Sequence, residues 1–180
     1  MEVRLIGANP GLTLFAADTD RPAAFASVWR VDWSTAGAGT ALVLWHDGHT
    51  RVISSSPDLG VWLAEEFTRH FPEVAGLPWP APKVTAAPVA VELDLAHGVR
   101  AAAADVEIEI TGPMDRRLVR ADDFDLGGTP HLLSTVLMPC RSGTVRVAGA
   151  PVPGEPRVRT EPRASSTAFL ADAEVWCRGS

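Results

Sequence analysis

The sequence predicts an α+β fold of mainly antiparallel strands, either a partly closed barrel or a curved sheet, with one packed helix at about residues 57–71. Three observations support this fold class. Proline and glycine, at 15 residues each, are spread along the 180-residue chain, as expected for many turns and short strands. Two stretches have the alternation and turn residues of β-hairpins, and one stretch repeats apolar residues at helical spacing.

The domain organisation follows from composition. A hydrophobic content of 46% suits a substantial core in one domain covering residues 1–180. A proline-rich crossing at 72–88 separates a front half (1–75), which holds strands and the helix, from a rear half (89–178), which holds strands. Because each half contributes open sheet, we expect the two halves to join in one β-rich domain.

The front half begins with short candidate strands at 3–6 and 12–16. A longer strand at 25–33 follows, and its apolar face carries Trp29 and Trp33. If exposed, that aromatic face is a candidate surface for a homodimer.

A hairpin at 41–54 is predicted by the dipeptide Asp47-Gly48, which a two-residue type I′ turn prefers. His46 and His49 flank this turn and point to the same side. Two imidazoles so placed are candidate metal ligands, but a stable site needs three or four ligands, and spacing nominates no third. We therefore predict no metal site and keep two solvent-facing histidines as the simpler interpretation.

The helix at about 57–71 has clear start and stop signals. Ser56 is a candidate N-cap, Pro57 suits the first helical position, and Pro72 ends the helix. Trp62 and Phe67 lie on its apolar face. These two aromatic side chains are either ordinary core or part of the lining of a ligand cavity.

The central stretch 87–111 is predicted to be a single hairpin. A turn at His97-Gly98 places Val89 opposite Val106 and separates an apolar from an acidic face. The apolar face comprises Val89, Val91, Leu93, Ala102, Ala104, Val106, Ile108 and Ile110, and the acidic face Glu92, Asp94, Asp105, Glu107 and Glu109.

The stretch 126–140 is the most suggestive place for a site. Gly127-Gly128 permits unusual backbone angles or close approach to a ligand, and it precedes a run that is apolar on both faces, as in a central strand. Thr129 and His131 bring polar side chains to this run. His131 is either an acid or base, or a buried histidine bonded to the backbone.

Charge and cysteine content exclude several classes. A net charge of −6 disfavours nucleic acid as a partner. The chain begins without the apolar core of a signal peptide and has no apolar window long enough to span a membrane, so we expect no membrane partner and a cytoplasmic location. Cys140 and Cys177 are too few for a disulfide scaffold and are expected to be inert buried thiols, with pairing of the two as the alternative.

Three functions stay open, and no cofactor fingerprint is present. The favoured one is binding of an apolar or aromatic small molecule, with Thr129, His131, Trp62 and Phe67 as candidate contacts. The second is an enzyme that uses His131 with a carboxylate of the central hairpin, Glu107 or Glu109, for proton transfer. The third is a homo-oligomeric structural or interaction protein.

Overall fold

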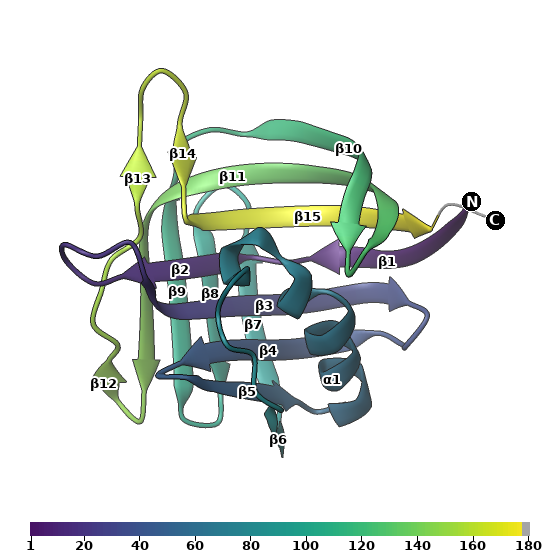
Figure 1. Cartoon of the computed structure of the whole chain (residues 1–180), viewed down its shortest axis with the longest axis horizontal. Helices are drawn as coiled ribbons and strands as arrows, with labels where there is room; N and C mark the ends of the chain where they lie inside the picture. The colour runs from purple at the N-terminus through teal and green to yellow at the C-terminus, as the bar shows by residue number, and fades with distance from the viewer. Residues whose placement is uncertain (178–180) are drawn as a thin grey trace.

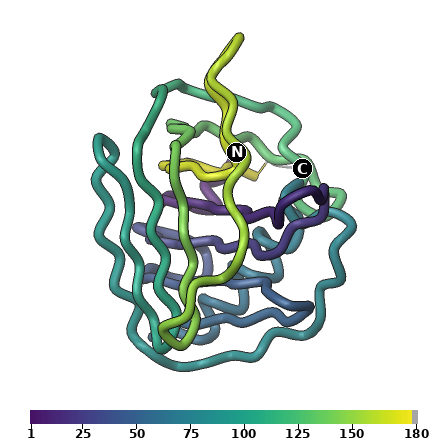
Figure 2. Tube along the Cα trace, turned by 90° about the vertical axis from the view of Figure 1, so that its left-hand side faces the viewer, coloured from purple at the N-terminus to yellow at the C-terminus, as the bar shows by residue number. Residues whose placement is uncertain are grey.

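A mainly antiparallel sheet of thirteen strands dominates the computed structural model, which describes residues 1–177. The sheet folds into two layers that face each other (Figures 1 and 2). The front layer contains β1 (Glu2–Ala8), β2 (Gly11–Phe15), β3 (Pro22–Ser34), β4 (Gly39–His46), β5 (His49–Ser54), β6 (Lys83–Ala86), β10 (Arg117–Leu126) and β15 (Ala168–Cys177). The rear layer contains β7 (Val89–Asp94), β8 (Gly98–Ala103), β9 (Val106–Pro113) and β12 (Ala150–Pro151).

The strand β11 (Thr129–Val147) belongs to both layers and joins them. Its first half pairs with β10 and β15, and its second half pairs with β9 and β12. The strand order is β6-β5-β4-β3-β1-β15-β11-β9-β8-β7, so strands from both halves of the chain share one sheet. At the far margin the Thr40 hydroxyl donates a hydrogen bond to the Val89 carbonyl, at 2.9 Å. The curved sheet is thus partly closed into a ring, as the fold class predicts.

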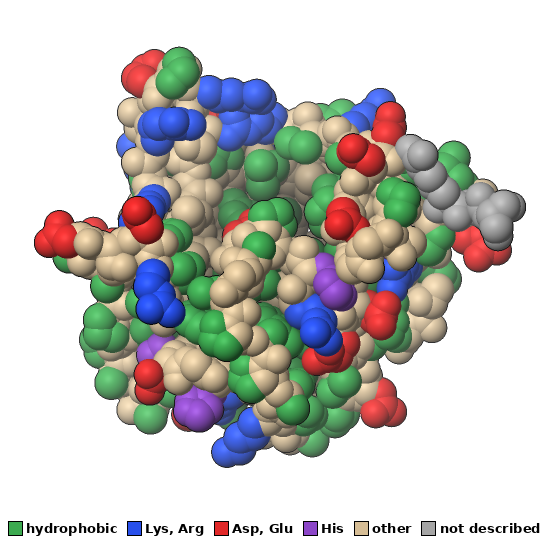
Figure 3. All heavy atoms as spheres, in the orientation of Figure 1, with side chains coloured by type: hydrophobic (Ala, Val, Ile, Leu, Met, Phe, Trp, Pro, Cys, Tyr) green, Lys and Arg blue, Asp and Glu red, His purple; other side chains and the backbone are tan. Residues whose placement is uncertain are grey.

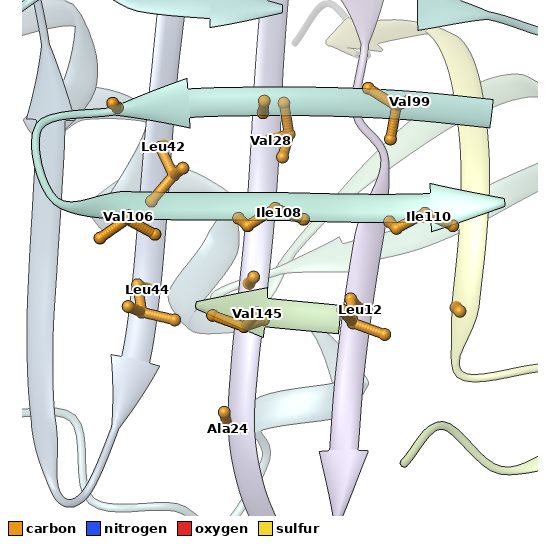
Figure 4. Close-up of a cluster of buried hydrophobic side chains, with 14 of the residues drawn as sticks. Leu12, Ala24, Val28, Leu42, Leu44, Val99, Val106, Ile108, Ile110 and Val145 are labelled. Carbon is orange, nitrogen blue, oxygen red and sulfur yellow. The ribbon is translucent and has the colours of Figure 1, made fainter. Parts of the chain in front are cut away.

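The space between the layers is filled by apolar side chains. Alternate residues of β3 and β4, such as Val28 and Leu42, meet Ile108 and Ile110 from β9 (Figure 4). These four side chains are 2% exposed or less. The interior of the partly closed sheet is therefore a packed core.

The helix α1 (Pro57–Glu66) packs on the outer face of β4 and β5 (Figure 1). It begins at the predicted proline but ends earlier than the predicted stop, because Phe67 leaves the helical conformation with φ −125° and ψ −71°. Two 3₁₀ turns follow, η1 (Thr68–His70) and η2 (Pro72–Val74). Within residues 1–177, no helix is both long and apolar enough to cross a membrane.

The N-cap expected at Ser56 is wrong in detail. The Ser56 side chain makes no capping hydrogen bond, and its backbone N–H instead donates to the Ser54 hydroxyl at 3.0 Å. The first helical bond still forms, from the Gly60 N–H to the Ser56 carbonyl.

The first predicted hairpin is confirmed. β4 and β5 pair His46 with His49 across Asp47-Gly48, and both turn residues have positive φ, 52° and 73°. These angles are those of a type I′ turn.

The prediction of one hairpin over 87–111 is wrong, because the stretch forms a three-stranded meander. The chain turns a second time at Ala104-Asp105, so Ala103 pairs with Val106 on one side and with Val89 on the other. Ala104 sits at φ 50°, which alanine rarely adopts, so the sequence carried no turn signal there. The predicted inward set holds on β7 and β9 but shifts on β8, where the residues that face inward are Val99, Ala101 and Ala103.

The proline-rich crossing covers the lower part of the front layer. Val74 packs with Phe25 and Trp45 in a separate buried cluster. The Trp45 indole N–H donates to the Pro78 carbonyl at 2.9 Å. After this cover the chain enters β6, which pairs with β5 in parallel.

Candidate functional site: an apolar groove on the front layer

A groove of about 420 Å³ opens on the outer face of the front layer, between the η1–η2 turns, β10 and the segment that follows β14 (Ser165–Ser166). Figure 3 shows the hollow from outside, with hydrophobic side chains around its mouth. β14 and β13 (Val158–Arg159) form a small two-stranded sheet beside it (Figure 1). A cavity of this size suits a small molecule.

β15 and β11 make the floor of the groove, and strand periodicity determines which of their side chains line it. Alternate residues point to the same face of a strand, so cross-strand pairs line the groove two positions apart. The pairs on the floor are Leu133 with Val175, Thr135 with Ala173, Leu137 with Ala171 and Pro139 with Phe169. The small alanines in this set leave room above the strands.

One wall is a row of aromatic rings from three different parts of the chain. Trp29 on β3 lies 5.7 Å from Phe67 and 6.1 Å from Phe71, measured between ring centroids. Phe71 in turn lies 6.5 Å from Phe124 on β10. The Trp29 indole N–H is satisfied by the Thr68 hydroxyl, at 3.2 Å. The wall is therefore rigid and apolar.

Two charged side chains, Glu73 and Arg117, line the groove. Glu73 comes from η2, and burial raises the pKa of its carboxyl group above the usual 4.5, while a hydrogen bond from its own backbone N–H offsets part of this. Arg117 begins β10 and is paired with the Asp115 carboxylate at 3.3 Å. Its guanidinium also donates to the Ala164 carbonyl. The acid is thus the charged group of the groove that lacks a counter-ion within residues 1–177.

The neutral polar groups of the groove are engaged with the protein. The Asn9 amide donates to the Ser27 hydroxyl at 2.8 Å and to the Val28 carbonyl at 2.9 Å. The Thr135 hydroxyl donates to the Asp172 carbonyl at 3.1 Å. These bonds orient the polar side chains toward the sheet.

Phe67 lines the groove, whereas the other predicted contacts lie beside it. Trp62 packs edge-on against Phe67, 5.1 Å between centroids, and Arg4 lies over both rings. Thr129 is exposed at the start of β11. His131 is 1% exposed and precedes the floor residues on β11.

Both ring nitrogens of His131 are hydrogen-bonded to the protein. Its Nδ1 lies 2.8 Å from the Thr129 carbonyl, and its Nε2 lies 2.7 Å from the Arg4 guanidinium. A neutral ring with the hydrogen on Nδ1 satisfies both partners at once. Arg4 also binds Glu66 at 2.7 Å, so it ties β1 to β11 and α1. The arrangement matches the buried histidine that is bonded to the backbone.

The carboxylates of the central stretch are not brought near His131. Glu107 pairs in register with Arg146 at the far end of β11, and Glu109 lies 3.0 Å from Arg100 on the neighbouring strand. Both face outward from the rear layer. His131 lies near the start of β11, whereas Glu107 and Glu109 lie on β9, which pairs with the second half of β11, so the structure does not bring the groups proposed for proton transfer together.

The double glycine before β11 forms a tight turn. Gly127 and Gly128 have φ 67° and 85°, and Leu126 pairs with Thr129 across them. A Cβ atom on Gly127 would lie 2.8 Å from the His70 ring. The unusual backbone angles predicted for these glycines are present, whereas their close approach to a ligand stays a prediction.

His46 and His49 face each other across the first hairpin, one half-buried and one exposed. Over residues 1–177, the His, Cys, Asp and Glu side chains form no group of three or more that could hold a metal ion.

The two cysteines are free and differ in environment. Cys140 is buried, and burial raises the pKa of its thiol to about 11. Its thiol donates to the Met138 carbonyl at 3.4 Å. Cys177 is half-buried.

Trp29 and Trp33 do not form a shared exposed face. Trp29 is 2% exposed beneath the aromatic wall, whereas Trp33 is 47% exposed. The homodimer stays a prediction.

Sequence reasoning missed Glu73, Phe71 and Phe124 as parts of one site. Glu73 lies in the 3₁₀ turn η2, Phe71 directly precedes that turn, and Phe124 lies on the edge strand β10. No fixed spacing in the sequence connects these three residues. The available signal was the pair Ala171 and Ala173 at alternate positions of an otherwise bulky strand, because two small residues on one face leave space.

Comparisons of the chain with known family models, with curated proteins and with solved structures find no match in any of the three. The groove is consequently interpreted from its own geometry.

Proposed function

We propose that this protein binds an apolar small molecule in the groove between η2, β10 and β15. The observation that carries the proposal is a groove of about 420 Å³ with a mainly apolar floor, a wall of four aromatic rings and one half-buried acid. Binding sites for small molecules typically combine such an apolar lining with a few polar groups. The space between the two layers, in contrast, is occupied by a cluster of buried hydrophobic side chains (Figure 4).

The ligand would lie across β11 and β15, with its flat or aliphatic body against Phe67, Phe71 and Phe124. Burial of apolar surface supplies the affinity at roughly 25 cal/mol for each Å² removed from water. We place this binding in the cytoplasm, a proposal that the free thiols of Cys140 and Cys177 support, because thiols stay reduced there.

The test uses the full chain and the neutral dye Nile red, whose emission rises in apolar surroundings. We expect saturable binding of one dye per chain. Replacing Ala173 on the floor with leucine fills part of the groove, and should weaken dye binding by about tenfold, which corresponds to about 1.4 kcal/mol.

The matched control is Ala102→Leu, the same substitution on an exposed strand position of the rear layer. It should leave dye affinity unchanged, and thermal melting should show that both variants fold. Equal affinity in the two variants, or no saturable binding by the unmodified chain, would refute the proposal.

A further inference from the structure

Glu73 is the least compensated charged group of the groove. Its carboxyl group is largely surrounded by protein, which raises its pKa, and its one assigned hydrogen bond comes from its own backbone N–H. Among the ion pairs of residues 1–177, Glu73 takes part in none. A partly buried carboxylate without a counter-ion costs stability, so this position is unfavourable in the empty protein unless the acid is protonated.

The surroundings of Glu73 suit a positive charge. Phe71, two residues earlier in the chain, belongs to the aromatic row that includes Trp29 and Phe124. The faces of aromatic rings attract cations, and the attraction grows when the site is shielded from water. A carboxylate that lines the same groove as these aromatic rings is therefore complementary to an ammonium group on an apolar body.

Arg117, the other charged group of the groove, does not favour an anionic ligand. Arg117 already has the Asp115 carboxylate at 3.3 Å and the Ala164 carbonyl as acceptors. An anionic ligand would have to compete with Asp115 for this guanidinium. The charged group of the groove that lacks a counter-ion among the described residues is therefore the acid, so the groove favours a cationic ligand.

We propose that the ligand of this groove is an amine, whose ammonium group pairs with the Glu73 carboxylate while its apolar body lies on the floor made by Ala171 and Ala173. This inference rests on the proposed function and adds the chemical class of the ligand. Ion pairing in a partly buried site is charge-assisted and stronger than a neutral hydrogen bond, so amine recognition should be measurable as selectivity.

The experiment compares three small probes that share one phenylbutyl body: 4-phenylbutylamine, 4-phenyl-1-butanol and 5-phenylvalerate. Each is titrated against the complex of the full chain with Nile red, at about pH 8, where an alkyl amine is protonated. We expect the amine to displace the dye at a concentration about tenfold lower than the alcohol, and the carboxylate to be the weakest.

Two variants locate the effect. Glu73→Gln removes the charge and should reduce the affinity of the amine to that of the alcohol, while the alcohol is unaffected. Glu174→Gln is the control, because Glu174 lies on β15 but is exposed and does not line the groove. It should preserve the preference for the amine.

The outcomes separate the two proposals. Equal affinity of amine and alcohol, tightest binding of the carboxylate, or an amine preference that survives in Glu73→Gln would overturn amine recognition while small-molecule binding stands. Failure of Nile red and of all three probes to bind would overturn both.

Discussion

At the scale of single residues, Glu73 connects the proposed ligand binding with the stability of the folded protein. Its position among apolar side chains favours the protonated acid, so in the empty protein the folded state holds this proton more tightly than the unfolded chain does. The stability that Glu73 contributes is complete below its unfolded pKa of 4.5 and is lost as pH rises through the raised pKa of the folded state.

Glu73→Gln should therefore melt at a higher temperature than the unmodified protein at about pH 8, because glutamine carries no charge to bury. The difference should shrink as the pH falls toward 4.5, where the native acid also becomes neutral. Thermal melts followed by circular dichroism over this range measure the effect. Glu174→Gln serves as the control, since Glu174 is exposed on β15 and does not line the groove. A melting difference for Glu73→Gln that stays constant with pH would contradict the assignment.

At the scale of elements, glycine substitutions at Ala102, within β8, and at Ala104, just after its end, test how turns define the rear layer. Ala104 has φ 50°, whereas Ala102 is in an extended strand. Glycine adopts positive φ without steric cost but loses more entropy in a strand.

We expect Ala104→Gly to raise the free energy of unfolding by about 0.5–1 kcal/mol and Ala102→Gly to lower it by about as much. Urea unfolding of both variants gives the comparison. If the two substitutions changed stability in the same direction, the turn at Ala104-Asp105 would be misplaced.

The difference between turns with and without a sequence preference for positive φ also explains which elements could be predicted from the sequence. Asp47-Gly48 is a dipeptide that prefers positive φ at both positions, so the first hairpin and its register followed directly. Ala104-Asp105 has no such preference, and the three-stranded meander was read as two strands. Pro57 fixed the start of α1, but the backbone of Phe67 ended it before Pro72 could.

The candidate site was predictable in smaller part, for the same physical reason. Phe67 was identified because it lies on a periodic helical face. Glu73 reaches the groove through the path of the proline-rich crossing, and Phe124 reaches it from β10, which pairs with β11 across the Gly127-Gly128 turn. No local pattern connects these two residues. His131 was correctly placed in a buried strand, but its partner Arg4 lies 127 residues away.

At the scale of the whole molecule, the two layers share β11 and one packed core, so we expect them to unfold together. Five of the six tryptophans belong to front-layer strands or α1, and the sixth to the crossing: Trp29, Trp33, Trp45, Trp62, Trp176 and Trp79. Tryptophan fluorescence therefore reports on the front of the molecule. A cavity made in the rear layer tests whether the front senses it.

Ile110→Ala on β9 should lower the free energy of unfolding by about 2–5 kcal/mol, because Ile110 is fully buried. Tryptophan fluorescence and far-ultraviolet circular dichroism should show this loss as one coincident transition. Glu109→Ala, an outward-facing change on the same strand, should have a small effect. Two separate transitions would show that the layers are independent.

The alternation of side chains along β15 also affects how the range of ligands proposed for the groove could change. Leu170 points into the core, while its neighbours Ala171 and Ala173 point into the groove. Selection for a smaller or larger ligand can act on the odd-numbered positions one methylene at a time and leave the even-numbered Leu170 untouched. If the groove binds a ligand as proposed, β15 has one face for folding and the other for recognition, and specificity can change without loss of the fold.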